Sequence, residues 1–195
     1  MGLVLDRKSH EYRLDGRRLA GVTEVIEAAG MMPPMYGPAD WYLGRGSAVH
    51  AATALLDEGT LDEASVDPQA AGYVDAYRAM RTTVGTDLVV QEIETSRYHE
   101  TLGYAGTPDR VVRWRGRLGV LEIKCGVDAG WHAIQLASYL RLVQGAETRL
   151  TVYLQKDGKW NLDECKPQNQ RADFDTFLAA LTLYRWREAH GVLVA

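Results

Sequence analysis

Three charged residues in the middle of the sequence have the types and the spacing of a hydrolytic metal site. Asp109 ends the segment Gly106-Thr107-Pro108-Asp109, and Glu122 and Lys124 follow it after thirteen and fifteen residues. Carboxylate oxygens suit Mg²⁺, which keeps several waters and binds substrate phosphate oxygens. A lysine beside such an ion can position or help to deprotonate water, or neutralise developing charge. The set indicates hydrolysis of a phosphodiester.

The segment between the two acidic residues predicts how they meet. Arg115-Gly116 fits a two-residue hairpin turn, and in that register Asp109 lies directly opposite Glu122. Directly opposed residues have Cβ atoms about 4.5–5.5 Å apart, and like charges there are destabilising unless positive charge lies between them. A divalent cation is the simplest such charge. Neutralising either acid is therefore expected to stabilise the metal-free fold.

Strand alternation gives these residues a common face. Glu122 and Lys124 lie on one side of the predicted strand, while Leu121 and Ile123 point the other way into apolar surroundings. The alternative is that Asp109, Glu122 and Lys124 form an exposed ladder of ion pairs, which is common and nearly neutral energetically.

The surrounding pattern predicts an α/β fold. Helices are expected over residues 24–29, 47–58, 68–83, 131–143 and 174–188, and strands over residues 3–5, 10–14, 88–98, 104–114, 117–124, 150–155 and 159–162. Ser47 is the expected cap of the second helix, and residues 31–41 are expected to form a loop because they contain three prolines. The order helix, three strands, helix, strand predicts a mixed central sheet flanked by helices.

Length and composition favour one globular domain. The chain has 195 residues, of which 46% are hydrophobic and 25% charged, and it contains no repeat or long linker. Its two cysteines are too few for a disulfide framework, a four-cysteine zinc site or an iron–sulfur cluster. No apolar run reaches the roughly 18 residues of a membrane span, and charged residues at 6–8 interrupt any signal-peptide core. The expected location is the cytoplasm.

Charge is unevenly distributed along the chain. The net charge of −4 gives no general argument for a nucleic-acid partner. Residues 51–77 contain six acids and no lysine or arginine, whereas residues 110–124 contain five basic residues and one glutamate. A local basic face can bind phosphates even when the total charge is negative, although such clusters are often only solvated surface.

Four ordered motifs resemble those of the PD-(D/E)XK nuclease superfamily, in particular its RecB-like and phage-type exonuclease branch. They are Arg45-Gly46-Ser47-Ala48-Val49-His50, Tyr104-Ala105-Gly106-Thr107-Pro108-Asp109, Glu122-x-Lys124 and Gln135-x-x-x-Tyr139. The resemblance implies a restriction-endonuclease-like αβββαβ core. It also implies a single nuclease domain over residues 1–195, with an N-terminal hairpin and helix (1–45), the nuclease core (about 46–156) and a C-terminal hairpin and helix (157–195).

The resemblance assigns a role to each motif residue. Asp109 and Glu122 are the metal carboxylates, Lys124 is the catalytic lysine, and His50 contributes to the metal site. Gln135 and Tyr139 share a helical face and order the site or contact DNA. The branch also places a glutamate on the preceding strand, where Glu92 and Glu94 both qualify and Glu94 fits the spacing better.

Basic and aromatic residues near these motifs are the candidates for contacts with DNA. The arginines predicted to reach backbone phosphates are Arg45, Arg110, Arg113 and Arg117, with Arg115 beside them. Trp131, together with Trp41 and Tyr42, is a candidate for stacking on a base, although such aromatics are more often packed.

These features together predict a stand-alone Mg²⁺-dependent deoxyribonuclease, with Mn²⁺ able to substitute, of the phage or RecB exonuclease type in recombination or repair. The chain lacks a Gly-x-x-x-x-Gly-Lys-[Ser/Thr] loop, so it is not an ATP-driven motor. The alternatives are a structure-specific or restriction-like endonuclease, and an inert DNA-binding module that kept the fold. DNA is the expected partner. The sequence leaves open the polarity of digestion, the number of ions, homo-oligomer formation and a single-strand annealing protein as a further partner.

Overall fold

The computed structural model describes residues 2–6, 9–33 and 39–192, and for residues 39–43 it describes the backbone alone. The helices are α1 (Val22–Ala28), α2 (Ala39–Glu58), α3 (Ala71–Val84), α4 (Trp131–Leu140) and α5 (Gln170–Ala189). The strands are β1 (Leu3–Asp6), β2 (Glu11–Leu14), β3 (Arg17–Gly21), β4 (Leu88–Ile93), β5 (Arg97–His99), β6 (Tyr104–Gly106), β7 (Arg110–Trp114), β8 (Arg117–Cys125), β9 (Thr148–Leu154) and β10 (Trp160–Glu164). Within these described ranges, no helix is long and apolar enough to cross a membrane.

The central sheet has the strand order β10-β9-β8-β7-β4. Strands β4, β7 and β8 are antiparallel neighbours, and β9 lies parallel to β8. Parallel neighbours need a crossover connection, which α4 supplies here. Along the chain, α2, β4, β7, β8, α4 and β9 follow in this order, with α3, β5 and β6 inserted between them. This order confirms the predicted restriction-endonuclease-like αβββαβ core.

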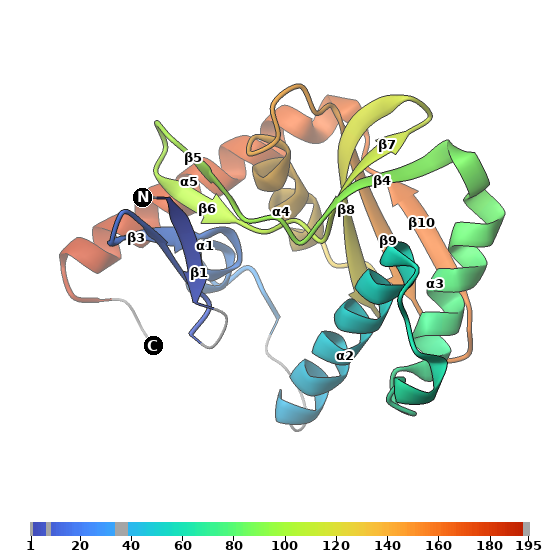
Figure 1. Ribbon diagram of the computed structural model, residues 1–195. Helices are drawn as coiled ribbons and strands as arrows, with labels where there is room; N and C mark the ends of the chain where they lie inside the picture. Colours follow the sequence, from blue (N-terminus) through green and yellow to red (C-terminus); the bar gives the residue numbers. More distant parts are fainter. Residues whose placement is uncertain (1, 7–8, 34–38, 193–195) are drawn as a thin grey trace.

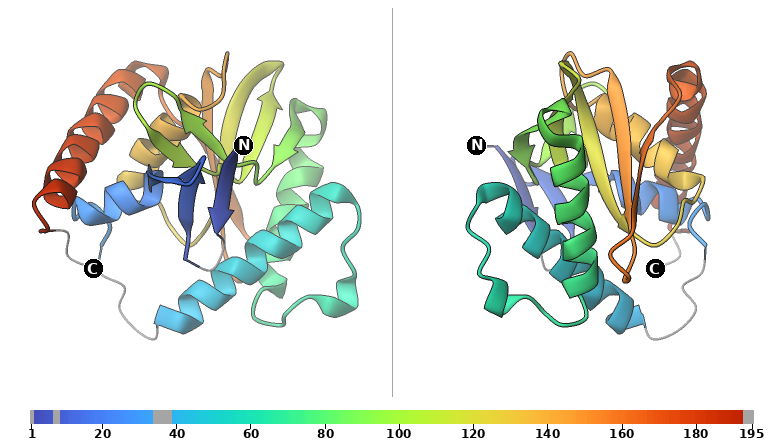
Figure 2. Two further views of the ribbon diagram at one scale, coloured as in Figure 1. Left: turned by 60° about the vertical axis from the view of Figure 1, so that its left-hand side comes forward. Right: turned by 90° about the vertical axis from the view of Figure 1, so that its right-hand side faces the viewer.

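Helices cover both faces of the central sheet (Figures 1 and 2). The right-hand view of Figure 2 shows the sheet nearly edge-on, with α2 and α3 on one side and α4 and α5 on the other. Leu121 and Ile123 belong to the apolar core on the α2–α3 side, whereas Val120 belongs to the core on the α4–α5 side. The predicted inward direction of Leu121 and Ile123 is confirmed. Their alternation places Glu122 and Lys124 on the face that α4 covers.

A second sheet, which the sequence did not predict, has the order β1-β2-β3-β6-β5. Two predicted strands are each split in the structure. The strand expected over residues 88–98 breaks at Glu94, whose φ is 45°, and the strand expected over residues 104–114 breaks at Pro108, which has no N–H for a ladder. Strand β6 pairs in parallel with β3, so residues 97–106 leave the central sheet and lie beside the N-terminal strands (Figure 1).

Helix α2 begins eight residues before the predicted cap. Ser47 therefore lies inside the helix, and so do Gly44 and Gly46, which each cost about 1 kcal/mol relative to alanine in a helix interior. The predicted loop over residues 31–41 falls partly on residues 34–38, which lie outside the described part of the chain. The consequence for the site is that His50 lies in the middle of a long helix instead of in its first turn.

Candidate active site

The β7–β8 hairpin places the first acidic residue beside the second strand. Arg115 and Gly116 have φ angles of 48° and 82°, as both positions of a type I′ turn require. The predicted register is confirmed as far as Arg110, which lies opposite Leu121. Asp109 directly precedes this ladder, and its Oδ2 accepts a hydrogen bond from the backbone N–H of Ile123 at 2.7 Å. The hairpin therefore holds the Asp109 carboxylate next to the Glu122 position.

Helix α2 brings His50 against Asp109. The distance from His50 Nδ1 to Asp109 Oδ1 is 3.0 Å, and Asp109 is only 8% exposed. The charge of Asp109 outweighs the effect of burial and raises the pKa of His50 to about 9. Burial by itself raises the pKa of Asp109, but His50, Lys124 and the Ile123 N–H together lower it below its ordinary value. The two residues therefore form an imidazolium–carboxylate pair near neutral pH.

Glu122 is the carboxylate with an unsatisfied oxygen. It is 4% exposed, and its Oε1 accepts a hydrogen bond from Lys124 Nζ at 3.0 Å. Its Oε2 is buried and has no hydrogen-bond partner in the described part of the chain. Burial and then the charge of Asp109 raise the pKa of Glu122 to about 7. Because an unpaired buried polar atom is costly, this oxygen beside a second carboxylate fits a divalent cation.

Lys124 is held in place from three directions. Its Nζ donates to Glu122 Oε1 and, at 2.9 Å, to Gln135 Oε1. The same atom lies 4.9 Å from the centre of the Trp131 ring, within range of a cation–π contact. An ammonium group has three N–H donors, and the third has no hydrogen-bond acceptor among the described residues. That donor is available to a water molecule or a phosphate oxygen.

Gln135 and Tyr139 occupy adjacent turns of α4 behind Lys124. Gln135 Nε2 lies 3.2 Å from the Tyr139 hydroxyl and 3.3 Å from Thr23 Oγ1. Gly106 permits this packing, because a Cβ at that position would come within 2.5 Å of the Tyr139 ring. The amide of Gln135 therefore points its oxygen at Lys124 and its nitrogen at two hydroxyl groups.

Several residues of the site had no signal in the sequence. The Tyr12 hydroxyl lies 2.9 Å from Thr107 Oγ1, and Ser96 Oγ lies 2.8 Å from the same atom. Tyr12 comes from β2 and Thr23 from α1, both in the N-terminal part of the chain. Only Thr107, inside the Gly-Thr-Pro-Asp segment, stood within a recognised motif. These hydroxyl groups therefore come from β2, from α1 and from the residues next to β5 and β6.

The four predicted metal ligands do not form one compact cluster. Among the described residues, no group of three or more His, Cys, Asp or Glu side chains is arranged to hold a metal ion. The Nδ1 atom of His50 is already engaged by Asp109. The backbone N–H of Glu94 donates to the Asp109 carbonyl at 3.0 Å, whereas Glu92 pairs with Arg97 at 2.6 Å. The role of Glu94 as a metal ligand stays a prediction. Mg²⁺ is usually bound by one or two protein carboxylates, and Asp109 and Glu122 supply that number.

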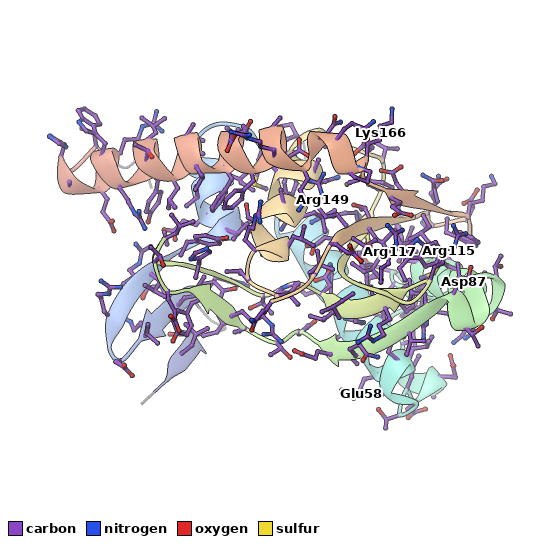
Figure 3. All side chains as sticks on the ribbon, turned by 90° about the horizontal axis from the view of Figure 1, so that it is seen from above. Glu58, Asp87, Arg115, Arg117, Arg149 and Lys166 are labelled. Atoms are coloured by element: carbon purple, nitrogen blue, oxygen red, sulfur yellow. The ribbon has the colours of Figure 1, made fainter. Side chains whose placement is uncertain are left out.

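The prediction that Arg110 contacts DNA is wrong, because this side chain is fully buried. Arg113 and Arg117 are exposed but lie toward the turn of the hairpin, and Arg117 pairs with Glu164 at 2.6 Å. Arg117 precedes Glu122 by five residues, which is about 17 Å along a strand. Figure 3 shows Arg115 and Arg117 near Asp87 at one end of the molecule. The structure does not bring these arginines together with Asp109.

The other candidate DNA contacts are placed differently. The Arg45 guanidinium lies 5.1 Å from the centre of the Tyr73 ring. Trp131 is half-buried at the start of α4 and packs on Lys124, which makes it part of the site itself. The side chains of Trp41 and Tyr42 lie outside the described residues.

The raised pKa of Glu122 predicts how the stability of the metal-free protein depends on pH. Its folded pKa of about 7 lies above its ordinary value of 4.5, so its stabilising contribution is complete below pH 4.5 and is lost as the pH rises through 7. Glu122→Gln should remove this loss. We expect the variant to match wild type near pH 4 and to exceed it by about 1–3 kcal/mol at pH 8, measured by urea unfolding in EDTA. A stability difference that does not change with pH would contradict this.

Comparison with known proteins rests on the fold, because no family model and no curated protein matches the sequence. The structure resembles the crystal structure of a "Putative exonuclease" from Eubacterium rectale, with a TM-score of 0.59 and 11% identity over 90% of this chain and 83% of that chain. It also matches LHK-Exo, an alkaline exonuclease from Laribacter hongkongensis, at 18% identity over 89% of this chain and 94% of that chain, with a TM-score of 0.39. The first likeness shows the shared fold, in agreement with the resemblance that the motifs indicate.

Proposed function

We propose that this protein is a divalent-metal-dependent nuclease that hydrolyses phosphodiester bonds at the ends of DNA, acting as an exonuclease in recombination or repair. One observation carries the proposal. The buried Glu122 has one oxygen held by Lys124 and a second oxygen without a partner among the described residues, beside the ionised Asp109. An exposed ladder of ion pairs would not be buried to this degree, so the alternative interpretation from the sequence is disfavoured.

Asp109 and Glu122 are the residues that would hold the ion, Mg²⁺ or Mn²⁺ in its place. The ion would polarise the scissile phosphate and lower the pKa of a bound water. His50 keeps Asp109 ionised by pairing with it at 3.0 Å. A cation bound beside Glu122 would favour its carboxylate form, because opposite charge favours the charged form.

Lys124 acts on the substrate through its third N–H donor. Glu122 and Gln135 fix the other two donors, and the Trp131 ring restricts the ammonium group from the side. An ammonium group held in advance can stabilise charge that develops on phosphate oxygens without the cost of reorganising. Gln135 and Tyr139 orient this lysine from α4.

Digestion at an end is supported by the fold shared with the Eubacterium rectale protein, whose name describes an exonuclease. The test compares linear duplex DNA with covalently closed circular DNA of the same sequence, each incubated with Mg²⁺. We expect linear DNA to lose nucleotides and closed circles to stay intact. Cleavage of both substrates would favour the endonuclease alternative. Binding of DNA without any cleavage would favour the inert DNA-binding module.

A further inference from the structure

Arg110 lies at the centre of a buried polar network between β7 and α2. Its Nε lies 2.7 Å from Asp57 Oδ2, and both side chains are almost completely buried. Its Nη1 donates to the Asp109 carbonyl oxygen at 2.7 Å, and its Nη2 donates to Thr53 Oγ1 at 3.3 Å. The guanidinium therefore joins the backbone of a candidate metal ligand to two residues of α2.

The same network reaches His50. Thr53 Oγ1, which accepts from Arg110, donates to the His50 carbonyl oxygen at 3.0 Å. His50, Thr53 and Asp57 are spaced by three and four residues, so they share one face of α2. Arg110 thus connects the backbones of both partners in the His50–Asp109 pair, whose side-chain atoms are 3.0 Å apart.

A buried ion pair is weak evidence for a stabilising role. Apolar residues of similar volume often replace such pairs without loss of stability. Asp57 also has two other partners, because Tyr77 donates to its Oδ2 at 2.7 Å and Arg81 Nε lies 3.2 Å from its Oδ1. Of these three partners of Asp57, Arg110 is the one that also donates to the Asp109 carbonyl oxygen. The hydrogen bond from Arg110 to the backbone of Asp109 is therefore the contact that points to a functional role.

We propose that Arg110 is a positioning residue, which fixes α2 against the end of β7 so that His50 and Asp109 keep their mutual geometry. It acts through Asp109 and does not touch the substrate, because it is fully buried. The inference rests on the proposed function. Misplacing a reacting group by about 1 Å can cost 10²-fold in rate, and loss of the partners that orient metal ligands costs about 10–100-fold in metal affinity.

The test uses two matched pairs of variants. Arg110→Met removes the link, whereas Arg81→Met removes another arginine of Asp57 that has no contact with Asp109 or His50. Thr53→Val keeps the shape of the side chain and removes the hydroxyl, whereas Thr53→Ser keeps the hydroxyl. The second pair decides the question if Arg110→Met does not fold.

Four quantities are measured on each folded variant. They are kcat and KM for linear DNA, the dissociation constant for Mn²⁺ by calorimetry without DNA, and the His50 ring signals by NMR in the metal-free protein. For Arg110→Met we expect kcat to fall about 10²-fold with KM within about twofold. We also expect Mn²⁺ to bind about tenfold more weakly and the His50 signals to move. Thr53→Val should shift the same quantities in the same direction by about tenfold in kcat and about threefold in Mn²⁺ affinity, and Arg81→Met and Thr53→Ser should show none of these changes.

The readouts separate this inference from the proposed function. Unchanged His50 signals and unchanged Mn²⁺ affinity in Arg110→Met and in Thr53→Val would overturn the positioning role, even if wild type cleaves DNA. Equal changes in Arg81→Met would also overturn it, because they would show a general effect of the Asp57 network. If wild type cleaves no DNA but the His50 signals move as expected, the positioning role stands and the proposed function fails.

Discussion

Asp109→Asn is expected to lower the rate of DNA cleavage by about 10³-fold or more, because a metal ligand contributes several kcal/mol to the transition state and each 1.36 kcal/mol is a factor of ten. The same substitution should also destabilise the metal-free protein. Both oxygens of Asp109 are already acceptors, one from the Ile123 N–H and one from His50. Asparagine removes the negative charge that His50 and the Ile123 N–H contact, and losing a hydrogen bond to a charged group costs about 1–3 kcal/mol.

This result would distinguish the two carboxylates by their effect on the stability of the metal-free fold, for which the sequence predicted the same effect. Repulsion between opposed charges suggested that neutralising either acid stabilises the metal-free fold. The structure revises this for Asp109, whose pKa is lowered by His50 and its other partners in spite of burial, and keeps it for Glu122, whose pKa is raised. Thermal melting of Asp109→Asn and Glu122→Gln in EDTA at pH 8 should give shifts of opposite sign. Stabilisation by both substitutions would mean that repulsion dominates and that the His50–Asp109 pair is weak.

Lys124→Met is expected to lower kcat by about 10²–10³-fold, the usual cost of removing one preorganised donor from a transition state. Methionine keeps much of the aliphatic length, so contact with Trp131 and the fold should persist. The matched control is Lys159→Met, because Lys159 is 74% exposed and, within the described part of the chain, its ion pair is with the nearby Asp157. Steady-state kinetics on linear DNA at saturating Mg²⁺ measures both variants. Wild-type kcat in Lys124→Met, or an equal loss in Lys159→Met, would contradict the role assigned to this lysine.

The local geometry of the site could be predicted because short-range rules determine it. The Arg115-Gly116 turn fixes the register of the hairpin, and the period of two fixes which side chains share a face. The positions of Gln135 and Tyr139 on one face of α4 follow from the helical period in the same way. These rules use residues that are close together in the chain, and the structure agrees with them.

Features that depend on distant residues could not be predicted in this way. The parallel pairing of β3 with β6 joins segments more than eighty residues apart, and no local pattern in either segment predicts this pairing. Arg110 looked like one of several basic residues on a hairpin, but its partner Asp57 lies 53 residues away on α2. Because Asp57 is its partner, Arg110 is buried in the structure instead of exposed at the surface. The sequence also placed His50 in the first turn of its helix, because Ser47 is a good cap and glycines disfavour a helix interior, but α2 begins at Ala39.

The central claim is that Asp109 and Glu122 hold a divalent cation which DNA cleavage requires. The most direct measurement is the release of nucleotides from linear duplex DNA by EDTA-treated protein as Mg²⁺ is added back, with wild type and Glu122→Gln side by side. The account predicts no release by wild type in EDTA, a saturable return of activity with Mg²⁺, and no return in Glu122→Gln at any Mg²⁺ concentration. Cleavage by wild type in EDTA, or the same Mg²⁺ dependence in both proteins, would contradict it.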